Sequence, residues 1–179
     1  KQGESGASFT YTKVSEGNWN WKHTFAVTGN AGETITYTAT DKYGRKSDIS
    51  YTYKVDKSAP SVEITSPTEA KGYVGSTLST IKSFSGLAID PDEAGVSNSS
   101  YIKDVRYSFD NTTDFDTWTS VSGVQSSVKT NWVANIDFGT VSGEKTVYFK
   151  ARDNAGNISD VTSKDVIVDG TRPVISITV

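Results

Sequence analysis

A short motif occurs twice in this chain, once in each half. Residues 39–48 read Ala-Thr-Asp-Lys-Tyr-Gly-Arg-Lys-Ser-Asp, and residues 151–160 read Ala-Arg-Asp-Asn-Ala-Gly-Asn-Ile-Ser-Asp. Downstream of each copy, residues 55–60 and residues 168–173 both begin with Val-Asp and end with Pro. The two pairs of matching segments keep their order while the offset between copies drifts by one position, which indicates a tandem repeat with small loop insertions.

Two further matches extend the repeat in both directions. Upstream, the Asn-Trp pair at residues 20–21 recurs at residues 131–132. Downstream, Val-Glu-Ile-Thr at residues 62–65 is similar to Ile-Ser-Ile-Thr at residues 175–178. The period is therefore about 112 residues, and dividing the 179 residues of the chain by this period gives about 1.6 repeats.

The repeat period predicts where the modules begin and end. We expect residues 1–60 to be the C-terminal half of one repeat plus a linker, residues 61–169 to be a complete repeat, and residues 170–179 to be the first strand of a following repeat. Residues 61–110 have no counterpart in the first repeat. We therefore expect the chain to be a window from a longer array; the alternative is that another chain supplies the missing strands.

The aliphatic residues predict sheets rather than helices. The chain has 18 Val and 11 Ile but two Leu, and β-branched residues favour strands whereas Leu favours helices. Apolar and polar residues alternate in residues 34–40 and again in residues 145–153, as in half-buried strands. Further strands are expected at residues 61–65, 78–89, 102–109, 116–121 and 131–138. About seven short strands per repeat predict an all-β fold of tandem immunoglobulin-like β-sandwich domains, of which the first is incomplete.

The inventory of reactive side chains is small. The chain has no Cys and a single His, His23, which excludes zinc fingers, thiol nucleophiles, disulfides and sites that need two imidazoles. No spacing of Ser, His and Asp matches a catalytic triad, so we expect no enzyme activity. The net charge of −3 without a basic patch argues against nucleic-acid binding. No apolar stretch approaches the roughly 18 residues that a membrane helix needs, so we expect no membrane insertion.

Each repeat carries two linked motifs, Ala-x-Asp-x-x-Gly-[Asn/Arg] on a hairpin and then Val-Asp-x-[Ser/Thr]-x-Pro at the repeat junction. These motifs resemble the bacterial Ig-like (Big-type) repeats of surface adhesins and multidomain secreted proteins. Residues 105–110, followed by Trp118, resemble middle strands of the same family, and residues 85–90 are similar to its second strand. Arg45 stands where the hairpin motif usually carries Asn, so the first hairpin is the weaker match.

The resemblance implies a mechanical function outside a bacterial cell. Such repeats act as non-enzymatic structural or adhesive stalks of cell-surface or secreted proteins, spacing a distal binding or catalytic region from the cell. The implied partners are neighbouring repeats of the same chain and a host or cell-surface protein or glycan. The linker agrees with this role, because Pro60 fixes its own backbone φ angle and biases Ala59 to an extended conformation.

Acidic residues gather where two modules are expected to meet. In an immunoglobulin-like sandwich, the loop after the second strand and the last hairpin lie at the same end as the N-terminus. The loop would supply Asp90, Asp92 and Glu93, while the hairpin would supply Asp153 and the linker Asp56. Carboxylates suit Ca²⁺, which takes six to eight oxygen ligands, and the family resemblance implies calcium at such junctions. The sequence therefore predicts an interdomain calcium site.

A second interpretation of the same carboxylates needs no metal. Asp41 and Asp153 each stand at the start of a tight turn, where an Asp side chain accepts hydrogen bonds from backbone N–H groups. In this interpretation residues 90–92 form a solvated loop. The carboxylates do not have the spacing of an EF-hand loop, so both interpretations stay open.

The Trp residues offer another candidate site, because exposed aromatic rings can stack on sugars. Trp21 and Trp132 share a repeat position, and Tyr11 can be aligned with Trp118, which predicts packing roles for all four. Trp19 has no counterpart in the other repeat and is therefore the candidate ligand-binding residue. An accessory carbohydrate-binding module of a secreted enzyme is the alternative function.

Overall fold

The computed structural model describes most of the chain, namely residues 8–24, 31–69, 72–74, 81–92, 97–139, 142–169 and 174–177. The chain divides into two compact units, residues 1–55 (unit 1) and residues 56–179 (unit 2). The predicted module boundaries, after residues 60 and 169, stay a prediction. No helix within the described segments is long and apolar enough to cross a membrane.

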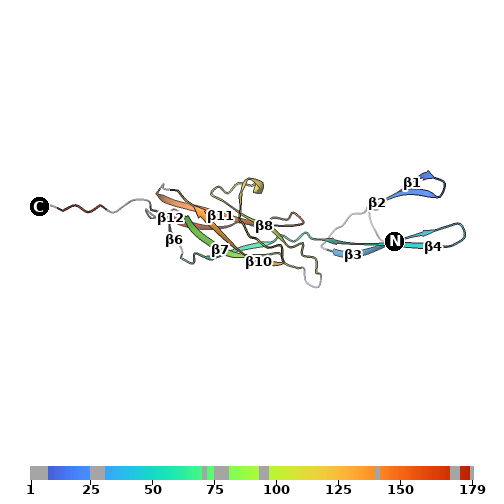
Figure 1. Cartoon of the computed structure of the whole chain (residues 1–179), viewed down its shortest axis with the longest axis horizontal. Helices are drawn as coiled ribbons and strands as arrows, with labels where there is room; N and C mark the ends of the chain where they lie inside the picture. Colours follow the sequence, from blue (N-terminus) through green and yellow to red (C-terminus); the bar gives the residue numbers. More distant parts are fainter. Residues whose placement is uncertain are drawn as a thin grey trace. The chain divides into compact units, whose positions relative to one another are not determined.

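Unit 2 contains two β-sheets (Figure 1). In order across the sheet, the three-stranded one consists of β10 (Lys129–Asp137), β7 (Ile81–Ile89) and β5 (Ser61–Ser66). The five-stranded one consists of β6 (Gly72–Val74), β12 (Thr162–Val168), β11 (Gly143–Asp153), β8 (Ile102–Ser108) and β9 (Thr119–Ser120). All neighbours are antiparallel except β6 and β12, which are parallel.

This strand order is that of an immunoglobulin-like sandwich. β5, β7 and β10 correspond to strands A, B and E, and β8, β11 and β12 to strands C, F and G. β9 extends the second sheet beside β8, as strand C′ does in variable-type domains. The predicted all-β, immunoglobulin-like sandwich is therefore confirmed for unit 2.

The core of unit 2 lies between the two sheets. Along β10, buried and exposed residues alternate without a break, as expected for a strand with one face in the core. The indole of Trp132 stacks on the ring of Phe149, which comes from β11 in the opposite sheet, at 4.7 Å between ring centroids. Val147, Phe149 and Ala151, which the alternating pattern of residues 145–153 places on one face, are all fully buried. Apolar packing between the sheets stabilises this unit, and the chain has no Cys to form a disulfide.

Gly86 is required where β7 runs between its two neighbours. It lies opposite Trp132 on β10 and opposite Ile64 on β5. A β-carbon at Gly86 would overlap both the carbonyl oxygen of Glu63 and the indole ring of Trp132. The indole therefore occupies the space that any other residue at this position would need for its side chain.

The strand predicted at residues 116–121 differs from the structure. A short 3-10 turn, η1 (Phe115–Thr117), precedes β9, which has two residues. The turn forms because the Asp114 carboxylate accepts a hydrogen bond from the backbone N–H of Asp116, at 3.1 Å. Trp118 ends the turn and is buried as predicted, with its indole N–H donating to Thr112 at 3.0 Å. Strong local capping by an Asp side chain therefore shortens the strand.

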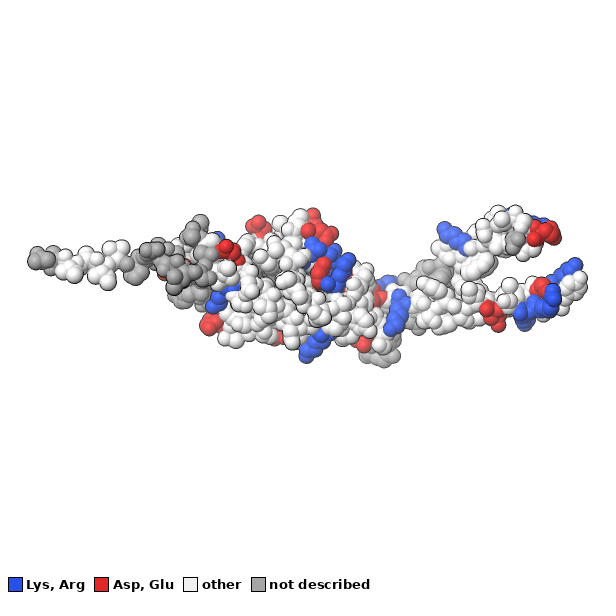
Figure 2. All heavy atoms as spheres, in the orientation of Figure 1, with Lys and Arg blue, Asp and Glu red and all other residues white. Residues whose placement is uncertain are grey.

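Two arginines sit beside the aromatic ring of this turn. Arg106 on β8 and Arg152 on β11 both donate to one oxygen of Asp104, at 3.2 and 2.7 Å. Their guanidinium carbons lie 4.9 and 5.1 Å from the centre of the Phe115 ring. Asp116 contacts both arginines from the exposed side, at 3.4 and 2.9 Å. Figure 2 shows basic and acidic side chains side by side in small mixed groups on the face of the molecule in view.

The described part of unit 1 contains two β-hairpins in separate sheets. One pairs β1 (Ser8–Ser15) with β2 (Asn18–Thr24), and the other pairs β3 (Ala31–Thr40) with β4 (Lys46–Val55). The turn between β3 and β4 is the predicted one, with Gly44 at a φ of 79° and two backbone N–H groups bonded to the Asp41 carboxylate. Among the described residues of unit 1, Ile35 alone is a buried hydrophobic residue. Tyr11 and Trp21, for which packing roles are predicted, are not core residues, since they are 69% and 49% exposed; the ring of Trp21 packs on that of Tyr37, at 4.5 Å between centroids.

Candidate metal centre

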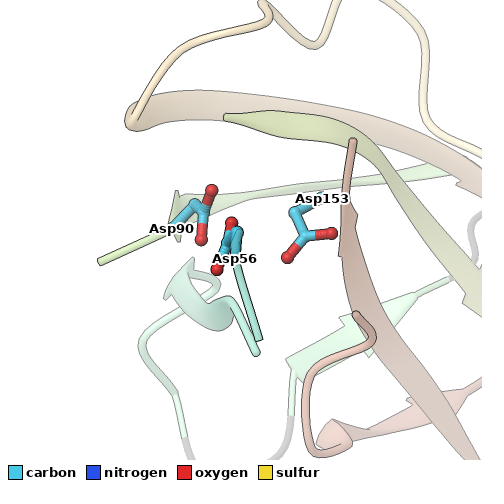
Figure 3. Close-up of side chains that lie close together, drawn as sticks. All are labelled: Asp56, Asp90 and Asp153. Atoms are coloured by element: carbon cyan, nitrogen blue, oxygen red, sulfur yellow. The ribbon is translucent and has the colours of Figure 1, made fainter. Parts of the chain in front are cut away.

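Three carboxylates converge at one end of unit 2. Asp56 precedes β5, Asp90 follows β7 and Asp153 is the last residue of β11. One carboxylate oxygen from each lies within 4.8 Å of the other two (Figure 3). Asp90 and Asp153 are fully buried and Asp56 is half-buried. Strands from both sheets therefore bring together side chains that are far apart in the sequence, from position 56 to position 153.

Asp153 is held by the hairpin that it begins. Its Oδ1 accepts hydrogen bonds from the backbone N–H groups of Gly156 and Asn157, at 2.7 and 2.8 Å. Its Oδ2 accepts from the side-chain amide of Asn157, at 2.8 Å. Gly156 has a φ of 99°, as the predicted tight turn requires. The turn-capping role proposed for Asp153 is therefore confirmed, and it points the carboxylate toward the other two.

Asp56 connects the linker to the loops of unit 2. Its Oδ2 accepts a hydrogen bond from the backbone N–H of Ser100 at 2.8 Å, and its Oδ1 accepts from Ser58 at 3.0 Å. Its backbone carbonyl accepts from the side-chain amide of Asn157, at 3.2 Å. Asp56 is thus held by hydrogen bonds to its side chain and to its main chain.

Asp90 has one carboxylate oxygen satisfied and one without a partner. Its Oδ2 accepts a hydrogen bond from the Ser99 hydroxyl, at 2.8 Å. Its Oδ1 is buried and has no hydrogen-bond partner. Burial raises the pKa of Asp90, the hydrogen bond from Ser99 opposes the shift, and the negative charges of Asp56 and Asp153 raise the pKa further. The solvated loop of the metal-free interpretation is therefore wrong at Asp90.

The ion pairs within the described residues do not include these three carboxylates. The Lys and Arg side chains that form those pairs do so with other carboxylates. A buried charge is costly unless it is paired or coordinates a metal. Three carboxylates offer the hard oxygen ligands that Ca²⁺ and Mg²⁺ prefer. The cluster can therefore hold a divalent cation through Asp56, Asp90 and Asp153.

The other two predicted ligands have different outcomes. Asp92 is exposed and outside the group of three, and its Oδ1 accepts from the backbone N–H of Ser99, at 2.8 Å. It therefore positions the residue that bonds Asp90. Glu93 lies outside the described residues. The three clustered carboxylates all belong to unit 2, and the predicted position of the site between two modules stays a prediction.

Sequence reasoning missed the residues that support the cluster. Ser99 and Ser100 lie in residues 97–101, which carry no metal-binding motif and end at Tyr101 with a φ of 71°. Asn157 belongs to the hairpin motif, but its bond to a residue 101 positions away has no signal in the sequence. The sequence predicts only the local part of the site, namely the hairpin turn and the Asp153 side chain that caps it.

Trp19, the candidate sugar-binding residue, lies in unit 1 at the edge of an apolar cleft. Its side chain is 54% exposed and meets the ring of Tyr11 edge-on, at 6.0 Å between centroids. Trp21 and Tyr37 line the same cleft, together with Ile49 of β4. The lining of the cleft thus combines aromatic rings with the polar residues Thr38, Thr40, Ser47 and Asp48.

No protein-family model matches the chain, and no curated protein matches its sequence. Solved structures that match include the sulfane dehydrogenase SoxCD from Paracoccus pantotrophus, with 22% identity and a TM-score of 0.38 over 68% of this chain and 27% of that chain. Fibronectin(III)-like modules of CbhA from Clostridium thermocellum match with 15% identity and a TM-score of 0.44 over 98% of this chain and 83% of that chain. A mutant of the SrpA adhesin from Streptococcus sanguinis matches with 12% identity and a TM-score of 0.37 over 65% of this chain and 60% of that chain. Because all three TM-scores are low, the fold assignment rests on the strand order.

Proposed function

We propose that this chain is a non-catalytic structural module of an extracellular bacterial surface or secreted protein, and that calcium bound by Asp56, Asp90 and Asp153 fixes its entry segment to the sandwich. The observation that carries the calcium site is the buried Oδ1 of Asp90, which lacks a hydrogen-bond partner and belongs to a cluster of three carboxylates. A cation there would supply the missing partner and offset the mutual repulsion of the three charges.

Calcium fits this donor set better than magnesium does. The carboxylates come from three separate segments and already accept hydrogen bonds from backbone and side-chain donors. Ca²⁺ accepts six to eight oxygens in flexible geometry, whereas Mg²⁺ demands near-ideal octahedral geometry and dehydrates reluctantly. An ionised carboxylate has about four lone-pair sites, so each can accept its present hydrogen bonds and still bind a cation.

The spacer role follows from where Asp56 lies in the sequence. It directly follows β4 and begins the short stretch to Pro60 that leads into β5. Holding the first residue of this stretch removes backbone freedom that a free linker would keep. In an array of repeats, each junction held in this manner would be stiff, which suits a rod that keeps a distal region away from the cell.

Calcium binding is tested by titrating Ca²⁺ into protein that has been treated with a chelator. We expect a binding heat in calorimetry and a higher melting temperature, because a ligand bound only by the native state adds about 2.7 kcal/mol of stability at a hundred times its Kd. Asp90→Asn should abolish both signals. Asp110→Asn, which changes an exposed carboxylate elsewhere in unit 2, should leave both unchanged. No heat and no shift at millimolar Ca²⁺ would refute the site.

The spacer role has a separate test in small-angle scattering. If calcium stiffens the segment after Asp56, the distribution of interatomic distances in the full chain should narrow when Ca²⁺ is added and broaden again with chelator. If calorimetry shows that the protein binds Ca²⁺ but the distance distribution is the same with Ca²⁺ and with chelator, the spacer role is refuted while the metal site stands. Asp90→Asn protein serves as the control and should give one distribution throughout.

An accessory carbohydrate-binding module is the second candidate function. The observation that favours it is the half-exposed indole of Trp19 beside Tyr11. On a glycan array we would expect specific binding that Trp19→Ala removes, because indole rings stack on sugar rings. Binding at background level across the array would eliminate this candidate.

A further inference from the structure

The turn that holds Asp153 has a close counterpart in unit 1. There Asp41 begins the turn between β3 and β4, and its Oδ1 accepts hydrogen bonds from the backbone N–H groups of Tyr43 and Arg45, at 2.8 and 2.9 Å. The backbone N–H of Asp41 also donates to the carbonyl oxygen of Arg45, at 2.9 Å. In unit 2 the backbone N–H of Asp153 donates to the carbonyl oxygen of Asn157, at 3.1 Å. Arg45 and Asn157 therefore occupy the same place, four residues after the aspartate.

The side chains at this place bind their aspartates in the same way. Arg45 donates from Nε to Oδ2 of Asp41, at 2.6 Å. Asn157 donates from its side-chain amide to Oδ2 of Asp153, at 2.8 Å. In each turn one carboxylate oxygen thus caps the backbone and the other binds the side chain four residues on. The two turns differ in the charge of this donor, because the guanidinium of Arg45 is positive whereas the amide of Asn157 is neutral.

The charge of the donor changes the electrostatics of its aspartate. Arg45 and Asp41 form an ion pair, and the side-chain hydrogen bond from Arg45 is the main reason that the pKa of Asp41 lies below its ordinary value. Asp153 forms no ion pair among the described residues, and it lies in a cluster with two more carboxylates. The guanidinium therefore balances the charge of its aspartate, whereas the amide leaves the charge of Asp153 unbalanced.

A positive charge at position 157 would act directly on the carboxylate cluster. The amide nitrogen of Asn157 lies 2.8 Å from Oδ2 of Asp153 and 3.2 Å from the carbonyl oxygen of Asp56. Asn157 is half-buried, whereas the side chain of Arg45 is 78% exposed. An exposed ion pair contributes little to stability, but charges in a partly buried cluster interact through a lower effective dielectric constant. The charge of the residue at this place therefore has a larger effect in unit 2 than in unit 1.

We propose that the residue after the turn glycine decides whether the carboxylate cluster binds calcium: Asn157 leaves the cluster without a positive charge, so that calcium binds, whereas arginine at this position would supply the charge and exclude the metal. This inference rests on the proposed calcium site and names the residue that controls it. Arg45 shows that the turn accepts arginine with its backbone hydrogen bonds in place. Asn157 is thus a positioning residue whose neutrality matters as much as its hydrogen bonds.

The turn of unit 1 is an example of the charged case. Asp41 belongs to no group of three carboxylates among the residues that the structure describes, and Arg45 is the cation that pairs with it. The turn of unit 2 is an example of the neutral case, in which Asp153 joins Asp56 and Asp90. Repeats of this kind would therefore fall into two classes, which bind calcium or contain their own cation, and one residue of the hairpin motif would distinguish them.

The test compares Asn157→Arg and Asn157→Ala with the unchanged protein, by calorimetry with Ca²⁺ and by urea denaturation with chelator. Asn157→Arg should weaken calcium binding about a hundredfold or more, because a positive charge beside the site repels the cation. Asn157→Ala should weaken it less, since only a neutral donor is lost. With chelator, Asn157→Arg should withstand more urea than Asn157→Ala, because the guanidinium offsets the repulsion among the carboxylates. A residue that only held Asp153 in place would rank the two variants in the same order in both measurements.

Two further variants complete the experiment. Arg45→Asn is the matched control and should leave the calcium heat unchanged, because Asp41 lies outside the cluster. Asn157→Lys has the same charge as the arginine variant on a smaller head group, and it replaces Asn157→Arg in both measurements if that variant does not unfold cooperatively.

Three results would overturn the proposal while the calcium site stands. These are calcium binding by the positively charged variant as tight as that of the unchanged protein, a loss of binding in Asn157→Ala as large as in the charged variant, and a charged variant that withstands less urea than Asn157→Ala. If the unchanged protein itself gives no heat with Ca²⁺, the calcium site and this inference are both refuted.

Discussion

The side-chain amide of Asn157 donates a hydrogen bond of 3.2 Å to the backbone carbonyl oxygen of Asp56, although the two residues are 101 positions apart. The same amide donates to the carboxylate of Asp153, at 2.8 Å. A single donor therefore connects the segment that enters unit 2 to the last hairpin of that unit. The strength of this connection depends on the amide, because only a donor suits two neighbouring acceptors.

Replacing the side-chain amide of Asn157 by a carboxylate, which only accepts, should destabilise the calcium-free protein. In Asn157→Asp, two hydrogen bonds are lost and a fourth carboxylate joins the cluster, so we expect the free energy of unfolding to fall by about 2–3 kcal/mol. Urea denaturation with chelator present measures this. Added Ca²⁺ should restore part of the loss. Asn135→Asp, on the exposed face of β10, should change stability by less than about 0.5 kcal/mol; a similar loss in both variants would contradict the assignment.

The free energy of unfolding of the calcium-free protein should depend on pH because the pKa of Asp90 differs between the folded and unfolded states. Burial raises the pKa of Asp90 above its ordinary value of 3.8. Between that value and the raised pKa, the folded protein retains a proton that the unfolded chain has lost. The free energy of unfolding therefore falls as the pH rises through this window. Asp41 contributes the opposite slope, because the hydrogen bond from Arg45 lowers the pKa of its carboxyl.

The contribution of Asp90 is isolated by comparing two proteins. We expect the difference in unfolding free energy between Asp90→Asn and the unchanged protein to grow in favour of the variant as the pH rises from the ordinary value of 3.8 through the raised pKa of Asp90. Urea denaturation at several pH values, with chelator, gives this difference. A difference that stays constant over this range would mean that Asp90 keeps its ordinary pKa in the folded state.

A single methyl group at Gly86 should strongly destabilise unit 2. In Gly86→Ala the new carbon meets a backbone oxygen of Glu63 and the indole of Trp132, and a backbone atom, unlike the end of a flexible side chain, does not move aside at low cost. Overpacking of this kind costs 1–3 kcal/mol and occasionally more, so we expect a loss of about 3 kcal/mol by urea denaturation. Ser83→Ala, at an exposed position on the same strand, should be nearly neutral. Equal stability of the two variants would show that β7 can shift away from β10.

The two aspartates beside Arg106 and Arg152 should contribute unequally to stability. Asp104 is 19% exposed and bonds both arginines, while Asp116 is 72% exposed. We therefore expect Asp104→Asn to cost about 2 kcal/mol, since it removes the negative charge that the two partly buried arginines share. Asp116→Asn should cost less than about 1 kcal/mol, and high salt should abolish that cost. If Asp116→Asn destabilises the protein more than Asp104→Asn does, the exposed contacts of Asp116 contribute more to stability than the bonds of Asp104.

Local patterns predicted the strands and turns well. Alternation placed Val147, Phe149 and Ala151 in the core, and the Asp-to-Gly spacing predicted both hairpin turns. These features depend on neighbours within a few residues, so the sequence displays them directly. The 3-10 turn at Phe115 was missed because side-chain capping by Asp114 outweighs the preference of the segment for strand.

The candidate site was only partly predictable. The sequence order of the strands brought Asp56, Asp90 and Asp153 to one end, as expected. The supporting contacts from Ser99 and Ser100 come from a loop without a metal-binding motif, and the course of this loop depends on packing between distant segments. The sequence predicted a packing role for Trp21, and its ring does pack on that of Tyr37, but how far the indole is exposed depends on residues distant in the sequence.

Asp56 is also the point at which tension would enter unit 2. A pulling force transmitted along the chain from its N-terminal side reaches Asp56 before it reaches β5. The bonds of Asp56 to Ser100 and Asn157 therefore bear the load ahead of the ladder between β5 and β7. Mechanical rupture of the module would begin at the carboxylate cluster, and the force needed to start it would be set there rather than in the sheets.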